Sequence, residues 1–335
     1  MQTSSAAKKA APRVTPYGDW VEPGFPFFSS ILDARDPANE VLTNNITPRG
    51  LVLNLGDDHW ACFDTDLLRM SAIWRGAGVT VEALAPRSYH PWGGKSRGGL
   101  FPAPAPLGEV IYANGIYPGW QLGRVPVLTD PREPAPDPNE VGRGPLPEKL
   151  GRMQAVRLVG ETVVLEYTAG DSRIREWVTQ AGGTVVRHFQ IEPGKEALVL
   201  VLGVRLQGQI NLAADAGKRP ARLRSSRKAS YVQVPPHDDT VAFRVAYGPG
   251  AGINPGKVNL PSAPNVSRWR QEVVTAATLS KSTGAYVIDD IALPFDNPWK
   301  RNVRPGDIQF LRDGTGVTAT LDGDVWLVRG LKDSL

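Results

Sequence analysis

Apolar and polar residues alternate with a period of two over most of the second half of the chain. Between residues 151 and 204, five runs rich in β-branched residues follow one another, separated by the short turns VGE, AGD, AGG and EPGKE. Alternation interrupted by glycine-containing turns is typical of antiparallel hairpins in series. Because the pattern continues to about residue 250, it predicts an all-β fold: an antiparallel β-sandwich of ordinary or large (super-sandwich) size.

Short strands are also predicted in the first half of the chain. The runs GLVLNLG (50–56) and HWACFD (59–64) are followed by LLRMSAIWRG (67–76). In the last run, alternate residues from Leu68 to Trp74 are apolar and share one face of a strand, although a short helix over DTDLLRMSAIW fits almost as well. We favour a strand.

Residues 85–150 are rich in proline and glycine, which is unusual for a region so long. A solvated linker does not carry large aromatic side chains. This region has six aromatic residues that indicate packing, so we predict an ordered loop on the sandwich; they are Tyr89, Trp92, Phe101, Tyr112, Tyr117 and Trp120.

The last part of the chain predicts a three-stranded meander. Its runs are 307–311, 317–321 and VWLVRG (325–330), joined by the turns RDGTG and DGD. Because so small a sheet cannot bury both of its faces, it either docks on the preceding domain or begins a repeated sheet. Under the second interpretation apolar side chains of 307–331 would be exposed and the chain truncated, whereas full burial would mark a complete protein. In either case we expect Trp299, Phe310 and Trp326 to pack on the main domain or to remain partly exposed.

Composition and charge exclude several classes of protein. Lys and Arg number 38 against 34 Asp and Glu, so a net charge of +4 gives no argument for a nucleic-acid partner. The basic segment 217–230 is interpreted as a solvated loop, with an anionic ligand or a membrane surface as the alternative. The single cysteine, Cys62, excludes an intrachain disulfide, a zinc cluster and a C-x-x-C-H haem attachment, and no segment is long enough to span a membrane as a helix.

Several phrases of the sequence resemble a known family. They include LTNNITPRGLVLNLGDDHWACFDTDLLRMSAIWRGAGVT, SYHPWGG, NGIYPGWQLG, LTDPREPAPDPNEVGRGPLP and GAYVIDDIALPFDNPWKRNVRPGDIQFLRDGTGVTATLDGDVWLVRGL. They are similar to DUF6797, an N-terminal domain of unknown function in multidomain proteins of planctomycetes and verrucomicrobia. In those proteins a β-propeller resembling sugar dehydrogenases and a c-type cytochrome domain follow the domain.

The resemblance implies a location and an organisation. It implies a periplasmic or otherwise extracytoplasmic protein, although this sequence has no recognisable signal peptide. It implies downstream propeller and cytochrome domains as partners, and haem c only in those domains, so we expect no cofactor in this chain. The expected organisation is a disordered leader over 1–15, a β-sandwich domain over 16–285 and a truncated meander over 286–335 that resembles a first propeller blade.

The first half of the chain holds the candidate functional residues. Flat aromatic rings interleaved with amides and charges suit a sugar, because rings stack on pyranose C–H faces while hydroxyl groups need polar partners. The structural alternative is that the tryptophans anchor the loop and the aspartates cap turns. The predicted ligand-binding residues are His59, Trp60, Trp92, Asn114, Tyr117 and Trp120, and the candidate catalytic residues are Tyr89, His90, Asp64, Asp66 and Arg69.

No catalytic or metal motif supports these candidates further. The chain has no G-x-S-x-G, H-E-x-x-H or phosphate-loop motif. A hard cation at His59, Asp64 and Asp66, or at Asp57 and Asp58, has only weak support, and we predict no metal. His188 is interpreted as an exposed strand residue, and His237 as part of a turn.

Two classes of function remain. The favoured interpretation is a non-catalytic module that binds carbohydrate or docks the other domains of an exported oxidoreductase-like protein. The alternative is a carbohydrate-active enzyme, a polysaccharide lyase or hydrolase, with Tyr, His, Asp and Arg in a groove.

Overall fold

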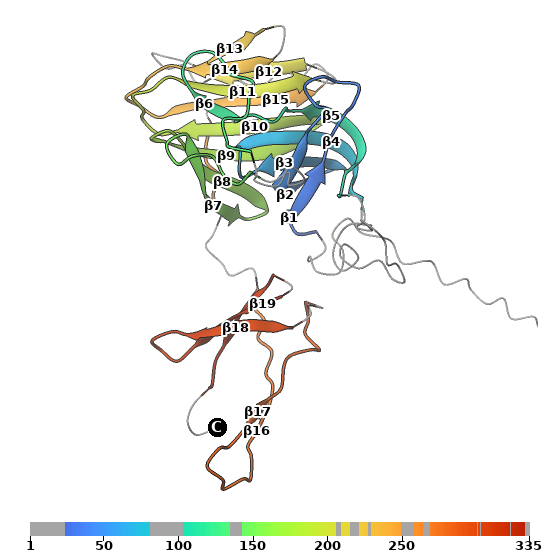
Figure 1. Cartoon of the computed structure of the whole chain (residues 1–335), viewed down its shortest axis with the longest axis vertical. Helices are drawn as coiled ribbons and strands as arrows, with labels where there is room; N and C mark the ends of the chain where they lie inside the picture. The colour runs from blue at the N-terminus through green and yellow to red at the C-terminus, as the bar shows by residue number, and fades with distance from the viewer. Residues whose placement is uncertain are drawn as a thin grey trace, which may run out of the picture. The chain divides into compact units, whose positions relative to one another are not determined.

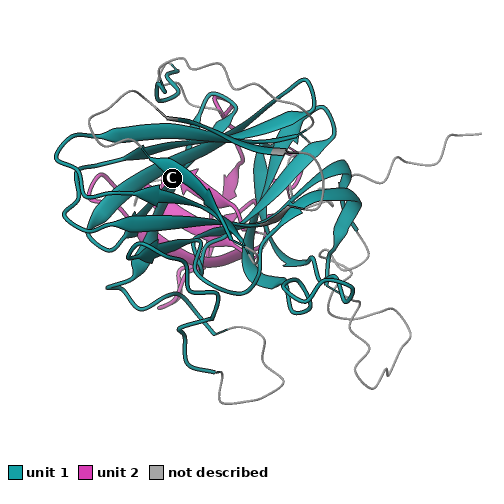
Figure 2. Ribbon diagram, turned by 90° about the horizontal axis from the view of Figure 1, so that it is seen from above, with its two compact units in different colours: residues 1–16, 23–264 teal, residues 17–22, 265–335 magenta. Residues whose placement is uncertain are grey.

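The chain divides into two compact units (Figure 2). Unit 1 contains the described residues between 24 and 263, and unit 2 those between 269 and 331. The sequence-based boundary at residue 285 therefore falls within unit 2. The computed structural model describes residues 24–80, 103–134, 143–205, 209–214, 221–226, 229–248, 258–263, 269–299, 301, 303–321 and 323–331. The predicted leader 1–15 lies outside these residues.

The first sheet of unit 1 is antiparallel, in the order β1-β2-β3-β4-β5-β11-β14-β13, with β6 also paired to β11 (Figure 1). Its first four neighbours are joined by consecutive hairpins, and β3 is buried along its whole length. The strands are β1 (Phe27–Asp33), β2 (Ile46–Gly56), β3 (His59–Asp64), β4 (Arg69–Val79), β5 (Pro106–Ala113), β6 (Trp120–Leu122), β11 (Leu198–Arg205), β13 (Arg222–Ser225) and β14 (Ser230–Val234).

The second sheet has the order β12-β15-β10-β9-β8-β7 and is also antiparallel. Four consecutive hairpin strands form one side of it, as the alternation between residues 151 and 191 predicts. The strands are β7 (Gly151–Val159), β8 (Thr162–Ala169), β9 (Ser172–Ala181), β10 (Thr184–Ile191), β12 (Gln209–Ala214) and β15 (Val241–Gly248).

The core lies between the two sheets and confirms the predicted sandwich. One apolar cluster joins side chains of the first sheet, such as Phe63 and Ile73, to side chains of the second, such as Leu165 and Phe243. Alternation explains the arrangement: β10 shows strictly alternating burial, so every second residue points into this cluster. Every regular element that the structure describes is a β-strand, and no helix among these residues could cross a membrane.

Two features differ from the sequence-based expectation. The Pro/Gly-rich region is not a continuous loop, because it contains β5 and β6; the short alternating run GEVIYA was hidden among its prolines. The fifth run of the 151–204 pattern, β11, does not extend the hairpin series but crosses to the first sheet, where it pairs with β5, β6 and β14. Local alternation gives a strand but not the sheet to which it belongs. The ambiguous run at residue 69 is strand β4, as predicted.

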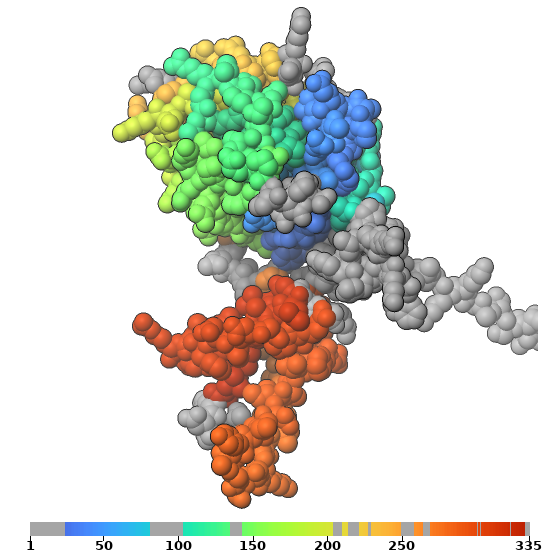
Figure 3. All heavy atoms as spheres, in the orientation of Figure 1, coloured from blue at the N-terminus to red at the C-terminus, as the bar shows by residue number. Residues whose placement is uncertain are grey.

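Unit 2 contains the predicted meander. Strands β18 (Pro305–Phe310), β19 (Gly316–Thr320) and β20 (Val325–Val328) form a three-stranded antiparallel sheet, and β16 (Ala277–Thr278) pairs with β17 (Asp290–Ile291). The rings of Trp299 and Trp326 pack edge to face at 5.4 Å, whereas Phe310 is 59% exposed. The orange and red atoms of this unit form a narrow body (Figure 3) with many exposed apolar side chains.

Candidate functional site

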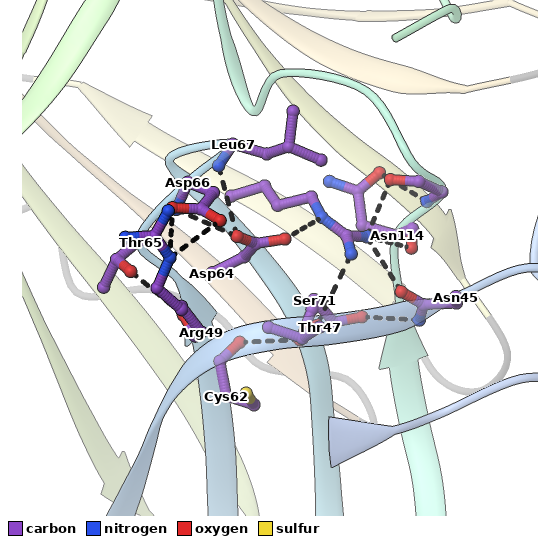
Figure 4. Close-up of polar contacts among 12 residues, drawn as sticks. Asn45, Thr47, Arg49, Cys62, Asp64, Thr65, Asp66, Leu67, Ser71 and Asn114 are labelled. Carbon is purple, nitrogen blue, oxygen red and sulfur yellow. Dashed lines mark hydrogen bonds and ion pairs between the residues drawn. The ribbon is translucent and has the colours of Figure 1, made fainter. Parts of the chain in front are cut away.

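Arg69 and Asp64, two of the candidate catalytic residues, form a buried ion pair at the turn between β3 and β4. Arg69 Nε donates to Asp64 Oδ2 at 3.0 Å, and neither side chain is more than 1% exposed. The other oxygen of Asp64, Oδ1, accepts the backbone N–H groups of Asp66 and Leu67 (Figure 4). One oxygen of the carboxylate therefore stabilises the β3–β4 turn, and the other orients the Arg69 side chain.

The remaining donors of Arg69 bind groups from distant parts of unit 1. Its Nη1 donates to Asn45 Oδ1 at 2.9 Å and to the carbonyl oxygens of Asn114 and Gly115 at 2.6 and 2.7 Å. These acceptors precede β2 and follow β5. The guanidinium thus connects three segments of the chain. Its hydrogen bonds and ion pair compensate for the cost of burying its charge.

Asp66 lies next to this pair and carries a different set of partners. Arg49 Nε donates to it at 3.1 Å, and Arg132 Nη1 lies 4.0 Å from it. Burial raises the pKa of Asp66, and the positive charge of Arg49 opposes that shift. A second carboxylate, Asp130, receives two hydrogen bonds from the Arg132 guanidinium, which hold its pKa below the usual range although burial acts to raise it.

Two predicted ligand-binding residues, Asn114 and Tyr117, lie close to Arg69 but are buried. Asn114 Nδ2 donates to the carbonyl oxygen of Val201, so it joins the end of β5 to β11. Tyr117 packs against Val199 and Val201 on the outer side of β11, and burial raises its pKa. In this arrangement both side chains support the sheet.

His59 and Trp60 stand at the other end of β3. His59 Nδ1–H donates to the carbonyl oxygen of Asp57 at 2.6 Å within the β2–β3 turn, and Trp60 Nε1 donates to the carbonyl oxygen of Gly76 at 3.0 Å. Both are buried. They are therefore separated along β3 from Asp64 and do not join the Arg69 cluster.

Trp120 belongs to a second buried polar network, between the two sheets. Its Nε1 donates to Tyr167 Oη at 3.0 Å, and Tyr167 donates to Glu176 Oε2 at 2.5 Å. Glu176 Oε1 accepts from Arg187 Nε at 2.6 Å, and both charged side chains are fully buried. Arg187 also donates to Tyr247 Oη at 3.3 Å.

Sequence reasoning missed this network, although the pattern contained a signal. Glu176 stands between Ile174 and Val178 on the buried face of β9, and Arg187 stands between Val185 and Phe189 on the buried face of β10. Opposite charges on the inward faces of two paired strands need each other, since neither is stable alone in a core.

The candidates Tyr89, His90 and Trp92 lie outside the described residues. Their predicted roles stay predictions. The other predicted aromatic residues, Trp60, Tyr117 and Trp120, are at most 6% exposed and present no free ring face to a sugar.

The remaining nucleophilic and basic groups are also held in structural positions. Burial raises the pKa of the Cys62 thiol to about 12, so the thiolate is suppressed. His188 alternates as predicted but is half-buried, not exposed, because its ring stacks on Trp177 at 5.1 Å. His237 is buried between Pro235 and Glu192, whose carbonyl oxygens it contacts.

Among the described residues, no group of three or more His, Cys, Asp or Glu side chains could hold a metal ion. In the Asp64–Arg69 cluster and in the Glu176–Arg187 network, the buried carboxylate forms an ion pair with a guanidinium. Both ion pairs hold strands or turns in place. One network stabilises the β3–β4 turn, and the other stabilises the interior of the sandwich at Trp120.

Comparison with known protein families gives a match to a family model. No curated protein matches the chain. Residues 61–176, from within β3 to within β9, match the family model described as Domain of unknown function (DUF6797).

Proposed function

We propose that the chain is a non-catalytic module of an exported multidomain protein, which docks another folded domain through the meander of unit 2 and binds carbohydrate. The observation that carries the docking proposal is the exposed apolar surface of β18–β20. Val325 and Leu327 are 68% and 57% exposed. A separate soluble sheet does not normally leave such side chains in water.

The strand register shows that this apolar surface is organised. Val317 pairs with Leu327 and Ala319 pairs with Val325, so the four side chains lie on one face of the sheet. The opposite face carries Ile308 and Phe310, also exposed. A sheet that is apolar on both faces is typical of one covered on both sides, and the resemblance supports a β-propeller as the covering domain.

A non-catalytic role is supported by the state of the ionisable groups. Asp64, Asp66 and Arg69 are each engaged in buried contacts, as described above. General acid–base catalysis needs a group that can reach the substrate and exchange a proton. The burial of these three residues therefore favours a structural role for them over catalysis.

The docking proposal is tested by measuring binding to a separately produced propeller–cytochrome polypeptide of a DUF6797-containing protein by isothermal titration calorimetry. The double variant Val325→Ser/Leu327→Ser is expected to lose binding by at least about tenfold, because two apolar anchors are removed. Ile31→Ser/Leu107→Ser, at exposed positions of unit 1, is the matched control. Unchanged affinity in the first variant contradicts docking through this face.

The carbohydrate proposal is tested on a glycan array together with an assay for reducing ends and unsaturated products. Binding without product formation is expected. Product formation that His90→Ala abolishes, with folding intact, would instead establish the carbohydrate-active enzyme.

A further inference from the structure

Two arginines project from the edge strand of the first sheet. Arg222 and Arg224 stand two residues apart on β13, and both are exposed. Residues at this spacing share one face of a strand and lie roughly 7 Å apart. They pair in register with Gln233 and Tyr231 of β14, so four polar or aromatic side chains occupy neighbouring places on one face.

Gln233 links this pair of strands to a third basic residue. Its Oε1 accepts a hydrogen bond from Arg224 Nε at 3.2 Å, and its Nε2 donates to the carbonyl oxygen of Arg124 at 2.5 Å. The loop that carries Arg124 is itself fixed, because the Gln121 side chain bonds both backbone groups of Val127. The exposed Arg124 therefore belongs to a held loop beside β14.

These three arginines share one property among the described residues. Within the part of the chain that the structure describes, no carboxylate forms an ion pair with Arg124, Arg222 or Arg224. Other arginines do have a carboxylate within 4.0 Å; they are Arg35, Arg49, Arg69, Arg132, Arg143, Arg152, Arg157, Arg175, Arg187, Arg301 and Arg329.

We propose that Arg222, Arg224, Gln233 and the Arg124 loop form a binding surface for a carboxylated polysaccharide, a polyuronate. The proposal rests on the glycan-binding part of the proposed function and gives it a place and a ligand class. An arginine fork binds a carboxylate through two parallel hydrogen bonds. The Gln233 amide, which already contacts Arg224 and Arg124, keeps one N–H and one oxygen lone pair for a sugar hydroxyl. The half-buried Tyr231 ring offers a flat surface for a pyranose.

Competing roles for this surface lead to different experimental outcomes. Charged side chains on an edge strand also protect it from pairing with another chain, and that role needs no ligand. A nucleic acid would call for a broader basic face than a net charge of +4 suggests. Val125 and Val127, exposed on the loop of Arg124, would suit an anionic membrane surface.

The experiment measures affinity of the full chain for polygalacturonate, for a neutral glucan of similar length and for vesicles of anionic phospholipid. We expect binding to polygalacturonate that weakens with added salt, and weaker or no binding to the other two. Arg222→Gln/Arg224→Gln should lower the affinity for polygalacturonate by about tenfold or more, since two charge-assisted contacts are lost.

The control variant removes the same charge elsewhere. Arg75→Gln/Arg173→Gln changes two exposed arginines, one on β4 and one in the second sheet, and should leave the affinity within about twofold of the original. An equal loss in both variants overturns the site, as does tighter binding to vesicles. If Arg222→Gln/Arg224→Gln binds polygalacturonate as tightly as the original protein does, the proposed site is wrong but carbohydrate binding by the chain is not contradicted. Failure to bind any glycan contradicts both the site and the carbohydrate-binding function.

Discussion

Arg69 and Asp64 are joined at 3.0 Å in a place from which solvent is excluded, and the arginine also holds the carbonyl oxygens of Asn114 and Gly115. The pair therefore connects the β3–β4 turn to the segment after β5. Its residue types, an acid and a base near aromatic rings, are the same as those of a catalytic site. Burial and complete hydrogen bonding indicate the structural role.

Replacing Arg69 with methionine should lower the free energy of unfolding by about 3–5 kcal/mol, because Asp64 is left as a buried charge without its partner. Urea unfolding followed by tryptophan fluorescence measures the change. Arg35→Met is the control: it breaks a 2.6 Å pair with Asp33 in which Arg35 is 49% exposed, and should cost less than about 1 kcal/mol. Equal losses of unfolding free energy in the two variants would contradict a structural role for the Arg69–Asp64 pair.

The hydroxyl group of Tyr167 connects Trp120 to Glu176, and Tyr167→Phe removes it without changing the ring. The variant leaves a buried donor and a buried carboxylate oxygen each with one partner fewer, so unfolding free energy should fall by about 1–3 kcal/mol. Tyr231→Phe, on the outer side of β14, should change it by less than about 0.5 kcal/mol. A neutral Tyr167→Phe would show that the network does not depend on this hydroxyl.

The sequence predicted the strands well and their sheet only in part. Alternation over β7 to β10 gave both the strands and their pairing, because neighbours in sequence are neighbours in the sheet. It could not assign β11, because its partners β5 and β14 belong to the first sheet and are not the strand that precedes it in the hairpin series. Strand β5 was hidden because Pro106 and Gly108 are turn residues by composition, yet Pro106 stands at the first position of the strand.

The candidate site was predictable in composition but not in burial. Asp64, Asp66 and Arg69 lie together at one turn, and the backbone carbonyl oxygen of Asn114, distant in sequence, accepts a hydrogen bond from Arg69. Whether such a group faces solvent depends on distant partners such as Asn45 and Arg132, which no local pattern identifies. Arg222 and Arg224 show the converse: their charge was visible in the sequence, but the lack of a partner carboxylate among the described residues was not.

His188 should make the fold less stable in acid. Burial, followed by the charge of Arg244, lowers the pKa of His188 from 6.5 to about 4. Between these values the unfolded chain binds a proton that the folded chain does not, so stability falls as pH decreases from about 6.5 to 4, by about 1–3 kcal/mol. The measurement is urea unfolding at several pH values for the protein and His188→Gln. The variant should show a shallower decline, and parallel curves would contradict the assignment.

Cys62 should resist thiol reagents until the protein unfolds. With a pKa of about 12, only about one molecule in ten thousand carries the thiolate at pH 8, and the side chain is fully buried. A chromogenic disulfide reagent should therefore titrate no thiol in the native protein and one thiol per chain in concentrated urea. Prompt reaction of the native protein would show that β3 opens readily.

Gly203 marks the point where β11 changes partner from β14 to β5, and alanine should destabilise the fold there. Its φ is +73°, and an added Cβ would stand 2.6 Å from the carbonyl oxygen of Ala113 and 2.7 Å from Asn114 Oδ1. Gly182 has a φ of +57° with open space around it, so Gly182→Ala should cost only the backbone strain of about 1–2 kcal/mol. Gly203→Ala should cost about 1–3 kcal/mol more, because crowding adds to the same strain. Since the two variants share the backbone penalty, the difference between their unfolding free energies measures the cost of steric crowding at Gly203. Equal values would mean that the backbone around Gly203 shifts to accept the methyl group at no cost in free energy.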